Sequence, residues 1–120
     1  MMTVIPSHEM QGYILTAQRQ ERRRQEQLEH RRQKGLAGAA TAAARLKQLG
    51  ATQVVLFGSL LDESFHEQSD IDLAVWGLPE KFYFKAVAQL QGIAGFEVDL
   101  VEAEDAMPHI VEAIAQGIEL

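Results

Sequence analysis

The sequence predicts an α/β (α+β) fold, in which helices pack on a small mixed β-sheet of about three strands and a long N-terminal helix precedes them. Three observations predict it. Residues 52–57, 70–76 and 96–101 are short runs of β-branched and apolar residues with the length and pattern of strands. Apolar residues at helical spacing lie between these runs. The 120 residues suffice for about one domain.

The first helix is expected to begin at Ser7, which can act as its N-cap. An apolar stripe at helical spacing follows, formed by Met10, Tyr13, Ile14 and Ala17. In residues 18–34, all good or tolerable helix formers, Leu28 is the only apolar side chain. A helix that is polar all round is either solvated or bound to a partner. We therefore expect residues 1–34 to form a helical polar arm, through which two copies of the chain could pair as a homodimer. Residues 35–120 are expected to form the folded domain.

Gly35 is expected to break this helix, so that residues 36–49 form a second one. Its apolar face is predicted to consist of Leu36, Ala39, Ala40, Ala43, Leu46 and Leu49. Gly50 lies just past its end, where a left-handed residue is common.

Helices are expected to connect and follow the strands. A short helical turn is predicted at residues 60–66, and a helix runs from Pro79 to about Gln91, because proline suits the first helical turn. Asp105 is expected to cap a last helix through about Gln116, and residues 118–120 to trail off. Strands and helices that alternate in this order imply a small sheet with helices packed on it.

Charge and composition narrow the function. The net charge is −6, divided between +3 in residues 1–34 (seven basic, four acidic) and −9 in residues 35–120 (four basic, thirteen acidic). The acidic body makes nucleic acid an unlikely ligand and suits hard cations. The absence of cysteine excludes disulfides, thiolate zinc sites and cysteine nucleophiles. Without a signal-like N-terminus or an apolar run of ~20 residues, we expect a cytoplasmic protein with no membrane association.

Two carboxylates point the same way from the second strand. Asp70 and Asp72 are two residues apart, which places them on one face at a separation of about 6–7 Å. That spacing suits carboxylates that flank two divalent ions about 3.5–4 Å apart. Aspartate is also depleted in strands, so a pair inside one needs a purpose. By itself Asp-x-Asp is a weak signal, since it also occurs in loops, calcium sites and hairpin turns.

Asp99 lies in the middle of the third strand, between two residues expected to be buried. If that strand is adjacent to residues 70–76, its carboxylate joins the other two on one face. Three acids gathered there would repel one another strongly unless metal ions neutralised them. Alternatively, Asp99 is a strand residue that faces water.

Gly58-Ser59 directly follows the first strand. Glycine lets a backbone approach a phosphate closely, and the amides at a helix start can hold phosphate oxygens together with the serine hydroxyl. Alone, a Gly-Ser after a strand is usually a turn.

Together these features resemble a known family. The sequence LFGS at residues 56–59, with Asp70 eleven residues after Ser59 in SDIDLAV and then FEVDLV at residues 96–101, resembles the DNA polymerase β-like nucleotidyltransferase superfamily. It is most similar to the smallest members, the minimal nucleotidyltransferase (MNT) proteins of prokaryotes. The resemblance covers roughly residues 36–120, so that residues 35–120 would be a nucleotidyltransferase domain.

The resemblance implies a reaction and a set of roles. A nucleoside monophosphate, AMP from ATP being the expected one, is transferred to an acceptor while pyrophosphate leaves. Asp70 and Asp72 would bind two Mg²⁺ ions, and Asp99 would bind the catalytic ion and orient or deprotonate the acceptor hydroxyl. Gly58 and Ser59 would hold the triphosphate. Catalysis of this kind rests on positioning and charge neutralisation.

The resemblance also suggests a partner. The chain has no room for an acceptor-binding domain, and the smallest family members typically act as antitoxins of HEPN-domain toxins, to which they can transfer AMP. We therefore expect an adenylyltransferase-like antitoxin whose partner is a HEPN-type toxin or another protein.

One departure from the family pattern favours other functions. Where members often continue Gly-Ser-x-Ala-Arg-Gly, this chain has Asp62-Glu63 in place of Arg-Gly, and an acidic pair near a triphosphate should weaken its binding. The alternatives are a non-catalytic module that neutralises or regulates a partner by contact, and the catalytic subunit of a two-chain transferase.

Overall fold

The structure is a computed structural model that describes residues 8–120, so the expected N-cap Ser7 lies outside the described residues. The chain forms two compact units, residues 1–30 and 31–120. Within the described residues, no helix is long and apolar enough to cross a membrane.

A single helix, α1 (His8–Gln48), takes the place of the two expected ones, so the predicted break at Gly35 is wrong. Glycine serves close packing there. A methyl group added to Gly35 would lie 2.9 Å from Leu60 Cδ1, and one added to Gly38 would lie 2.9 Å from Ala94 Cβ. A helix tolerates an interior glycine at a cost of about 1 kcal/mol, and here the missing side chain lets α1 approach its neighbours.

The buried face of α1 in the second unit follows from this continuity. Its buried residues are spaced three and four apart and are Gly35, Gly38, Ala39, Ala42, Ala43 and Leu46. Ala42 is fully buried, whereas Ala40, which was expected to face inward, is exposed. Gly50 follows the helix with a φ of +112°, as expected for a residue just past a helix end.

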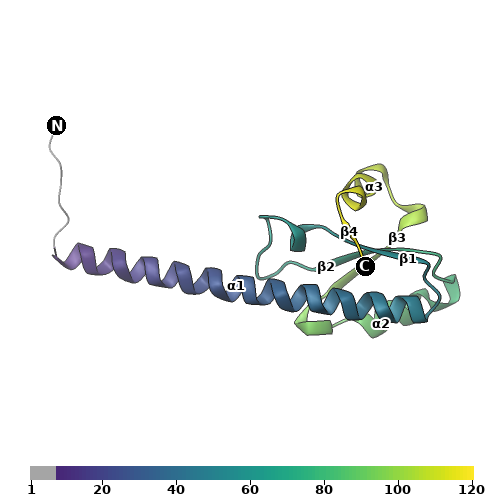
Figure 1. Ribbon diagram of the computed structural model, residues 1–120, viewed down its shortest axis with the longest axis horizontal. Helices are drawn as coiled ribbons and strands as arrows, with labels where there is room; N and C mark the ends of the chain where they lie inside the picture. Colours follow the sequence, from purple (N-terminus) through teal and green to yellow (C-terminus); the bar gives the residue numbers. More distant parts are fainter. Residues whose placement is uncertain (1–7) are drawn as a thin grey trace. The chain divides into compact units, whose positions relative to one another are not determined.

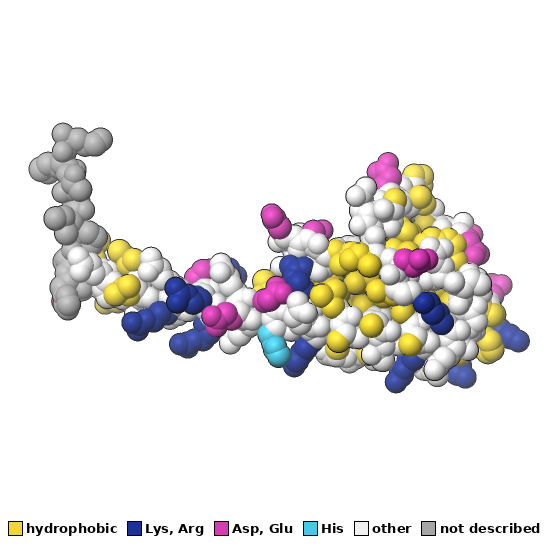
Figure 2. Space-filling view, in the orientation of Figure 1, with side chains coloured by type: hydrophobic (Ala, Val, Ile, Leu, Met, Phe, Trp, Pro, Cys, Tyr) yellow, Lys and Arg dark blue, Asp and Glu magenta, His cyan; other side chains and the backbone are white. Residues whose placement is uncertain are grey.

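The first unit carries basic and acidic side chains mixed along α1, as Figure 2 shows in dark blue and magenta. Residues 1–30 contain four basic and four acidic residues, which balance, and Arg24 pairs with Glu21 at 3.0 Å. The positive excess of residues 1–34 therefore comes from Arg31, Arg32 and Lys34, all in the second unit. Four apolar side chains in the first unit are between 46% and 76% exposed: Met10, Tyr13, Ile14 and Leu15.

The sheet is mixed, as predicted, but has four strands in the order β3-β2-β1-β4. They are β1 (Gln53–Phe57), β2 (Ile71–Trp76), β3 (Val98–Glu102) and β4 (Ile118–Glu119). β1 is antiparallel to both β2 and β4, while β2 and β3 are parallel. The residues expected to trail off thus add a strand at the β1 edge. Gly117 permits it, since a methyl group there would lie 2.4 Å from the Leu56 carbonyl oxygen.

Helices cover both faces of the sheet (Figure 1). On one face lie α1 and α2 (Tyr83–Leu90), over buried strand residues such as Leu56, Ile71 and Leu73. On the other face lies α3 (Pro108–Ala115), where Ile114 packs in a second apolar cluster with Val55, Phe57 and Ala74. Asp72 of β2 and Asp99 of β3 also project from this second face.

The remaining turns are shorter than predicted. The helical turn expected at 60–66 is a 3₁₀ turn at Ser59–Leu61, and another at Glu80–Phe82 leads into α2. Asp105 does not cap α3. It ends a 3₁₀ turn at Ala103–Asp105, and the extended Met107 is the N-cap because Pro108, with its fixed φ, opens the helix.

Candidate nucleotide and metal site

The strand register places Asp72 and Asp99 side by side. They are paired residues of the parallel strands β2 and β3, whose chains lie about 4.8 Å apart. Both project from the face that carries α3, because they alternate with the buried Leu73 and Leu100 of the opposite face. The adjacency on which the interpretation of Asp99 depended is therefore confirmed, and Asp99 is exposed to solvent.

Gly58 fits against the carboxylate of Asp72. β1 is in register with β2 so that Phe57 is opposite Asp72, and Gly58 follows directly. A methyl group at Gly58 would lie 2.1 Å from Asp72 Oδ2, and the glycine has a φ of +87°. Both the contact and the backbone conformation require a residue without a side chain. The chain leaving β1 is thereby brought against the acidic pair.

The electrostatic environment of Asp72 is unfavourable to its charged form. Partial burial, followed by the charges of Asp99 and Asp70, raises the pKa of Asp72 to about 6. Asp70 is partly buried and immediately precedes β2. In the described residues 8–120, no three or more His, Cys, Asp or Glu side chains converge as a ready set of metal ligands. The structure thus pairs Asp72 with Asp99 and brings the charge of Asp70 near, without assembling the three carboxylates.

The turn after β1 is closed by backbone hydrogen bonds. The amide of Leu61 donates to the Gly58 carbonyl, and that of Asp62 to the Ser59 carbonyl, both at 3.1 Å. Leu60 anchors the turn in the core with 1% of its surface exposed, while Ser59 is half-buried. Ser59 therefore sits on a fixed turn directly after Gly58 and the acidic pair.

The carboxylate of Asp62 is occupied within its own turn. It accepts hydrogen bonds from the Ser64 amide, at 2.8 Å, and from the Ser64 hydroxyl. These bonds, with a smaller contribution from the charge of Arg32, lower the pKa of Asp62. Asp62 is thus an exposed, ionised residue held by Ser64.

Arg32 is the residue near this site that sequence reasoning missed, because the sequence predicts a polar arm over residues 1–34. Its guanidinium donates to the carbonyls of Leu60 and Asp62, the second at 3.0 Å, and lies 4.8 Å from the centre of the Phe65 ring. Arg31 stacks 4.0 Å over the Phe96 ring. The available signal was helical spacing, since Arg32 lies three residues before Gly35 on the buried face of α1.

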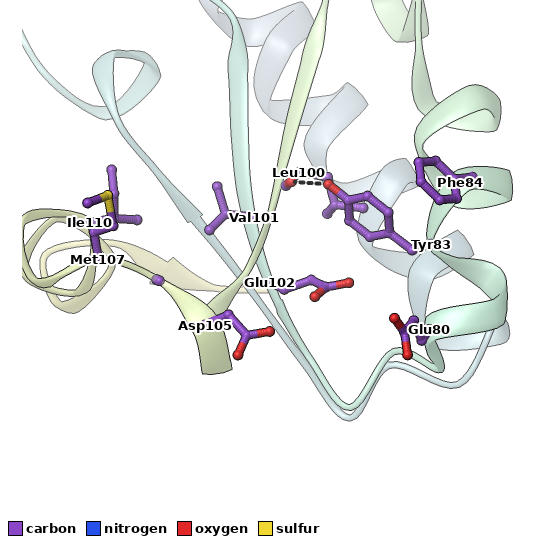
Figure 3. A pocket seen from close by; sticks show the side chains of 10 residues that line it. Glu80, Tyr83, Phe84, Leu100, Val101, Glu102, Asp105, Met107 and Ile110 are labelled. Carbon is purple, nitrogen blue, oxygen red and sulfur yellow. Dashed lines mark hydrogen bonds between the residues drawn. The ribbon is translucent and has the colours of Figure 1, made fainter.

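A cavity lies elsewhere, away from the predicted site. It measures about 520 Å³ and is seen in Figure 3 beside β3, with Glu80 and Tyr83 on one side and Met107 and Ile110 on the other. The Tyr83 hydroxyl donates to the Leu100 carbonyl at 3.2 Å. No predicted site residue lines the cavity. The cavity is therefore distinct from the acidic pair and from the Gly58–Ser59 turn.

Two strands that present paired aspartates beside a Gly-Ser turn, in a mixed sheet with helices on both faces, define a nucleotidyltransferase-type domain. The profile of the family described as "Polymerase beta, Nucleotidyltransferase" matches residues 44–120. The chain belongs to this family.

Solved structures share the fold. One is a mutant toxin–antitoxin complex MntA–HpeT, at 22% identity and TM-score 0.56, over 68% of this chain and 70% of that one. Another is the tri-AMPylated Shewanella oneidensis HEPN toxin with its MNT antitoxin, at 21% identity and TM-score 0.52, over 71% and 70%. A third, provisionally assigned as a minimal nucleotidyltransferase, has 25% identity and TM-score 0.54, over 78% and 91%. None of the curated proteins matches the chain.

Proposed function

We propose that this protein transfers AMP from ATP to a partner protein in a metal-dependent reaction, as the antitoxin of a HEPN-type toxin. The observation that carries the proposal is the pairing of Asp72 with Asp99 against the side-chain-free Gly58. The fold it shares with an MNT antitoxin and an AMPylated HEPN toxin supports the choice of nucleotide and partner. A structure of a toxin–antitoxin with AMP-PNP, 24% identical with a TM-score of 0.55, supports ATP as the substrate.

The residues at the site fit divalent cations. Ionised Asp72 is destabilised by burial and by two neighbouring acids, and a bound cation removes both penalties. Mg²⁺ takes a few carboxylates and completes its shell with water and phosphate oxygens. Asp70, Asp72 and Asp99 would hold two such ions, which supply neutralisation of the triphosphate and activation of its α-phosphorus. The three carboxylates repel one another while no cation is bound. Because bound cations would neutralise this repulsion, they are expected to draw the carboxylates together.

The remaining chemistry falls to the residues of the chain. The backbone amides of Gly58 and Ser59 and the Ser59 hydroxyl hold the triphosphate of ATP. Asp99 accepts the proton of the acceptor hydroxyl, whose oxygen forms a bond to the α-phosphorus while the bond to pyrophosphate breaks. The products are the AMP-modified acceptor and pyrophosphate. Because Asp99 is exposed, a hydroxyl on the surface of a large protein can reach it.

The test uses α-labelled ATP, magnesium and the product of the adjacent gene as acceptor. Wild type is compared with Asp70→Asn/Asp72→Asn and Asp99→Asn. Glu97→Gln is the matched control, since it removes one negative charge from an exposed position two residues before Asp99. Label is expected on the partner with wild type and Glu97→Gln, and its absence from the aspartate variants assigns the site.

A second candidate is a module that inhibits its partner by contact alone. The sequence Asp62-Glu63 and the unassembled carboxylates favour it. If no label moves and wild type and the aspartate variants bind and inhibit the partner equally, the contact mechanism replaces the transfer reaction.

A further inference from the structure

We propose that Arg32 is a positioning residue for the triphosphate: it holds the turn that follows Gly58 in the conformation that grips the nucleotide. The inference rests on the proposed function and adds a residue that lies outside the matched region 44–120. The observation that supports the inference is a long-range contact, since Arg32 binds Leu60, 28 residues further along the chain, and Asp62, 30 residues further along.

Two nitrogens of the Arg32 guanidinium bind two backbone carbonyls, those of the residues before and after Leu61, where the 3₁₀ turn ends. One nitrogen donates to Leu60 and the other to Asp62, at 3.0 Å. Arginine presents its donors in a rigid planar fork, so two simultaneous bonds fix the distance between the two carbonyls as well as their direction. The carbonyls point to Arg32, which sets the orientation of the Leu60–Leu61 and Asp62–Glu63 peptide units.

The surroundings hold Arg32 itself in place. Its guanidinium lies 4.8 Å from the centre of the Phe65 ring, whose residue is buried. One turn further along α1, Gly35 lies so close to Leu60 that an added methyl group would be 2.9 Å from Leu60 Cδ1. Leu60 is thus fixed from two sides, by its side chain in the core and by its carbonyl on Arg32.

A positive charge at this position has a second consequence. Asp62 is acidic where an anionic ligand is expected to approach, and the Arg32 charge acts on it directly. Arg32 therefore offsets negative charge beside the turn while it orders the backbone. Removing it should disorder the turn and make its surroundings more acidic, and both effects weaken the binding of a triphosphate.

The test compares Arg32→Gln and Arg32→Lys with Arg31→Met. Arg31 is the matched control because it precedes Arg32 and also stacks on an aromatic ring, that of Phe96 at 4.0 Å. Arg32→Gln and Arg31→Met should both lower the midpoint of thermal unfolding. Arg32→Gln should raise the Kd for magnesium-ATP by about tenfold, or about 1.4 kcal/mol, and speed hydrogen exchange at the Leu61 and Asp62 amides, whereas Arg31→Met should do neither. Arg32→Lys should recover less than half of the lost affinity on a logarithmic scale, since an ammonium lacks the fork.

The outcomes separate the two proposals. Wild type that does not bind magnesium-ATP refutes the proposed function, and this role with it. Wild type that binds, while Arg32→Gln binds equally well with unchanged exchange at Leu61 and Asp62, refutes the role of Arg32 alone. Full recovery by Arg32→Lys also overturns it, because charge without the fork would then suffice. A Kd raised equally by Arg31→Met would mean general destabilisation and would overturn it too.

Discussion

Replacing Asp72 with asparagine should make the metal-free protein more stable at neutral pH, although it removes a residue of the proposed site. Ionised Asp72 is partly buried beside the charges of Asp99 and Asp70, which raise its pKa from 3.8 to about 6. The folded chain therefore binds this proton more tightly than the unfolded chain does. Its stability falls as the pH rises from 3.8 towards 6, and the loss is complete above that range.

The magnitude follows from the two pKa values, 3.8 and about 6. At about 1.36 kcal/mol for each pH unit between them, ionised Asp72 would cost about 3 kcal/mol at pH 8 if it were fully buried, and solvent screening at this partly buried carboxylate reduces the cost to about 1.5 kcal/mol. At pH 4.5 much of the carboxyl is protonated in the folded chain, and the same linkage with the same screening gives a cost of about 0.5 kcal/mol. The free energy of unfolding of Asp72→Asn, which cannot ionise at this position, should exceed that of wild type by these amounts.

The assay is urea unfolding followed by circular dichroism at pH 4.5 and pH 8, with EDTA present. Glu97→Gln serves as the control for net charge, since an exposed substitution usually changes stability by within about 0.5 kcal/mol. Magnesium at ten times its Kd should then stabilise wild type by about 1.4 kcal/mol at pH 8 and leave Asp72→Asn unchanged. The electrostatic reasoning would be refuted if Asp72→Asn were less stable than wild type at pH 8. It would also be refuted if the stability difference between the two proteins were the same at pH 4.5 and pH 8.

Two further predictions concern glycines. Gly58→Ala should lower the free energy of unfolding by about 1–3 kcal/mol, since φ is +87° there and the new methyl group would meet Asp72. Magnesium should no longer stabilise this variant in a thermal melt, and unchanged stabilisation by magnesium would show that the contact between Gly58 and Asp72 does not matter. Gly38→Ala should destabilise by about 1–3 kcal/mol against Ala94, whereas Gly12→Ala, with nothing within 4 Å, should increase helicity by circular dichroism. Stabilisation by Gly38→Ala would contradict the close packing of α1.

The face shared by Asp72 and Asp99 was predictable from sequence because strand geometry is regular. Residues two apart on a strand share a face, so the apolar neighbours of Asp72 and Asp99 were enough to place both aspartates on the face opposite those neighbours. The parallel pairing of β2 and β3 remained conditional, since the order of strands depends on contacts across the whole chain. The raised pKa of Asp72 was also out of reach, because it depends on burial and on how close three carboxylates come.

Two of the errors share one physical cause, which is that a glycine can either end an element or allow a close contact. Gly35 was read as a helix breaker from its local propensity, yet it lies within α1 because Leu60 and Phe96 need its empty space. Similarly, Gly117 ended the expected last helix and was followed by a tail, but it lets residues 118–120 approach β1. Local propensity cannot separate a break from a close contact, since the neighbours that decide lie far away in the sequence.

The same distinction applies to charge. From sequence, the acidic Asp62-Glu63 pair weakened the case for triphosphate binding, and Arg31 and Arg32 belonged to a basic arm. In the fold, the guanidinium of Arg32 lies on the Leu60 and Asp62 carbonyls, and residues 1–30 carry no net charge. The charge that a ligand meets at this turn is therefore a sum over neighbours in space. A departure from a family's local pattern weakens a function only if no other residue in the fold supplies the missing charge, and here Arg32 lies where it can.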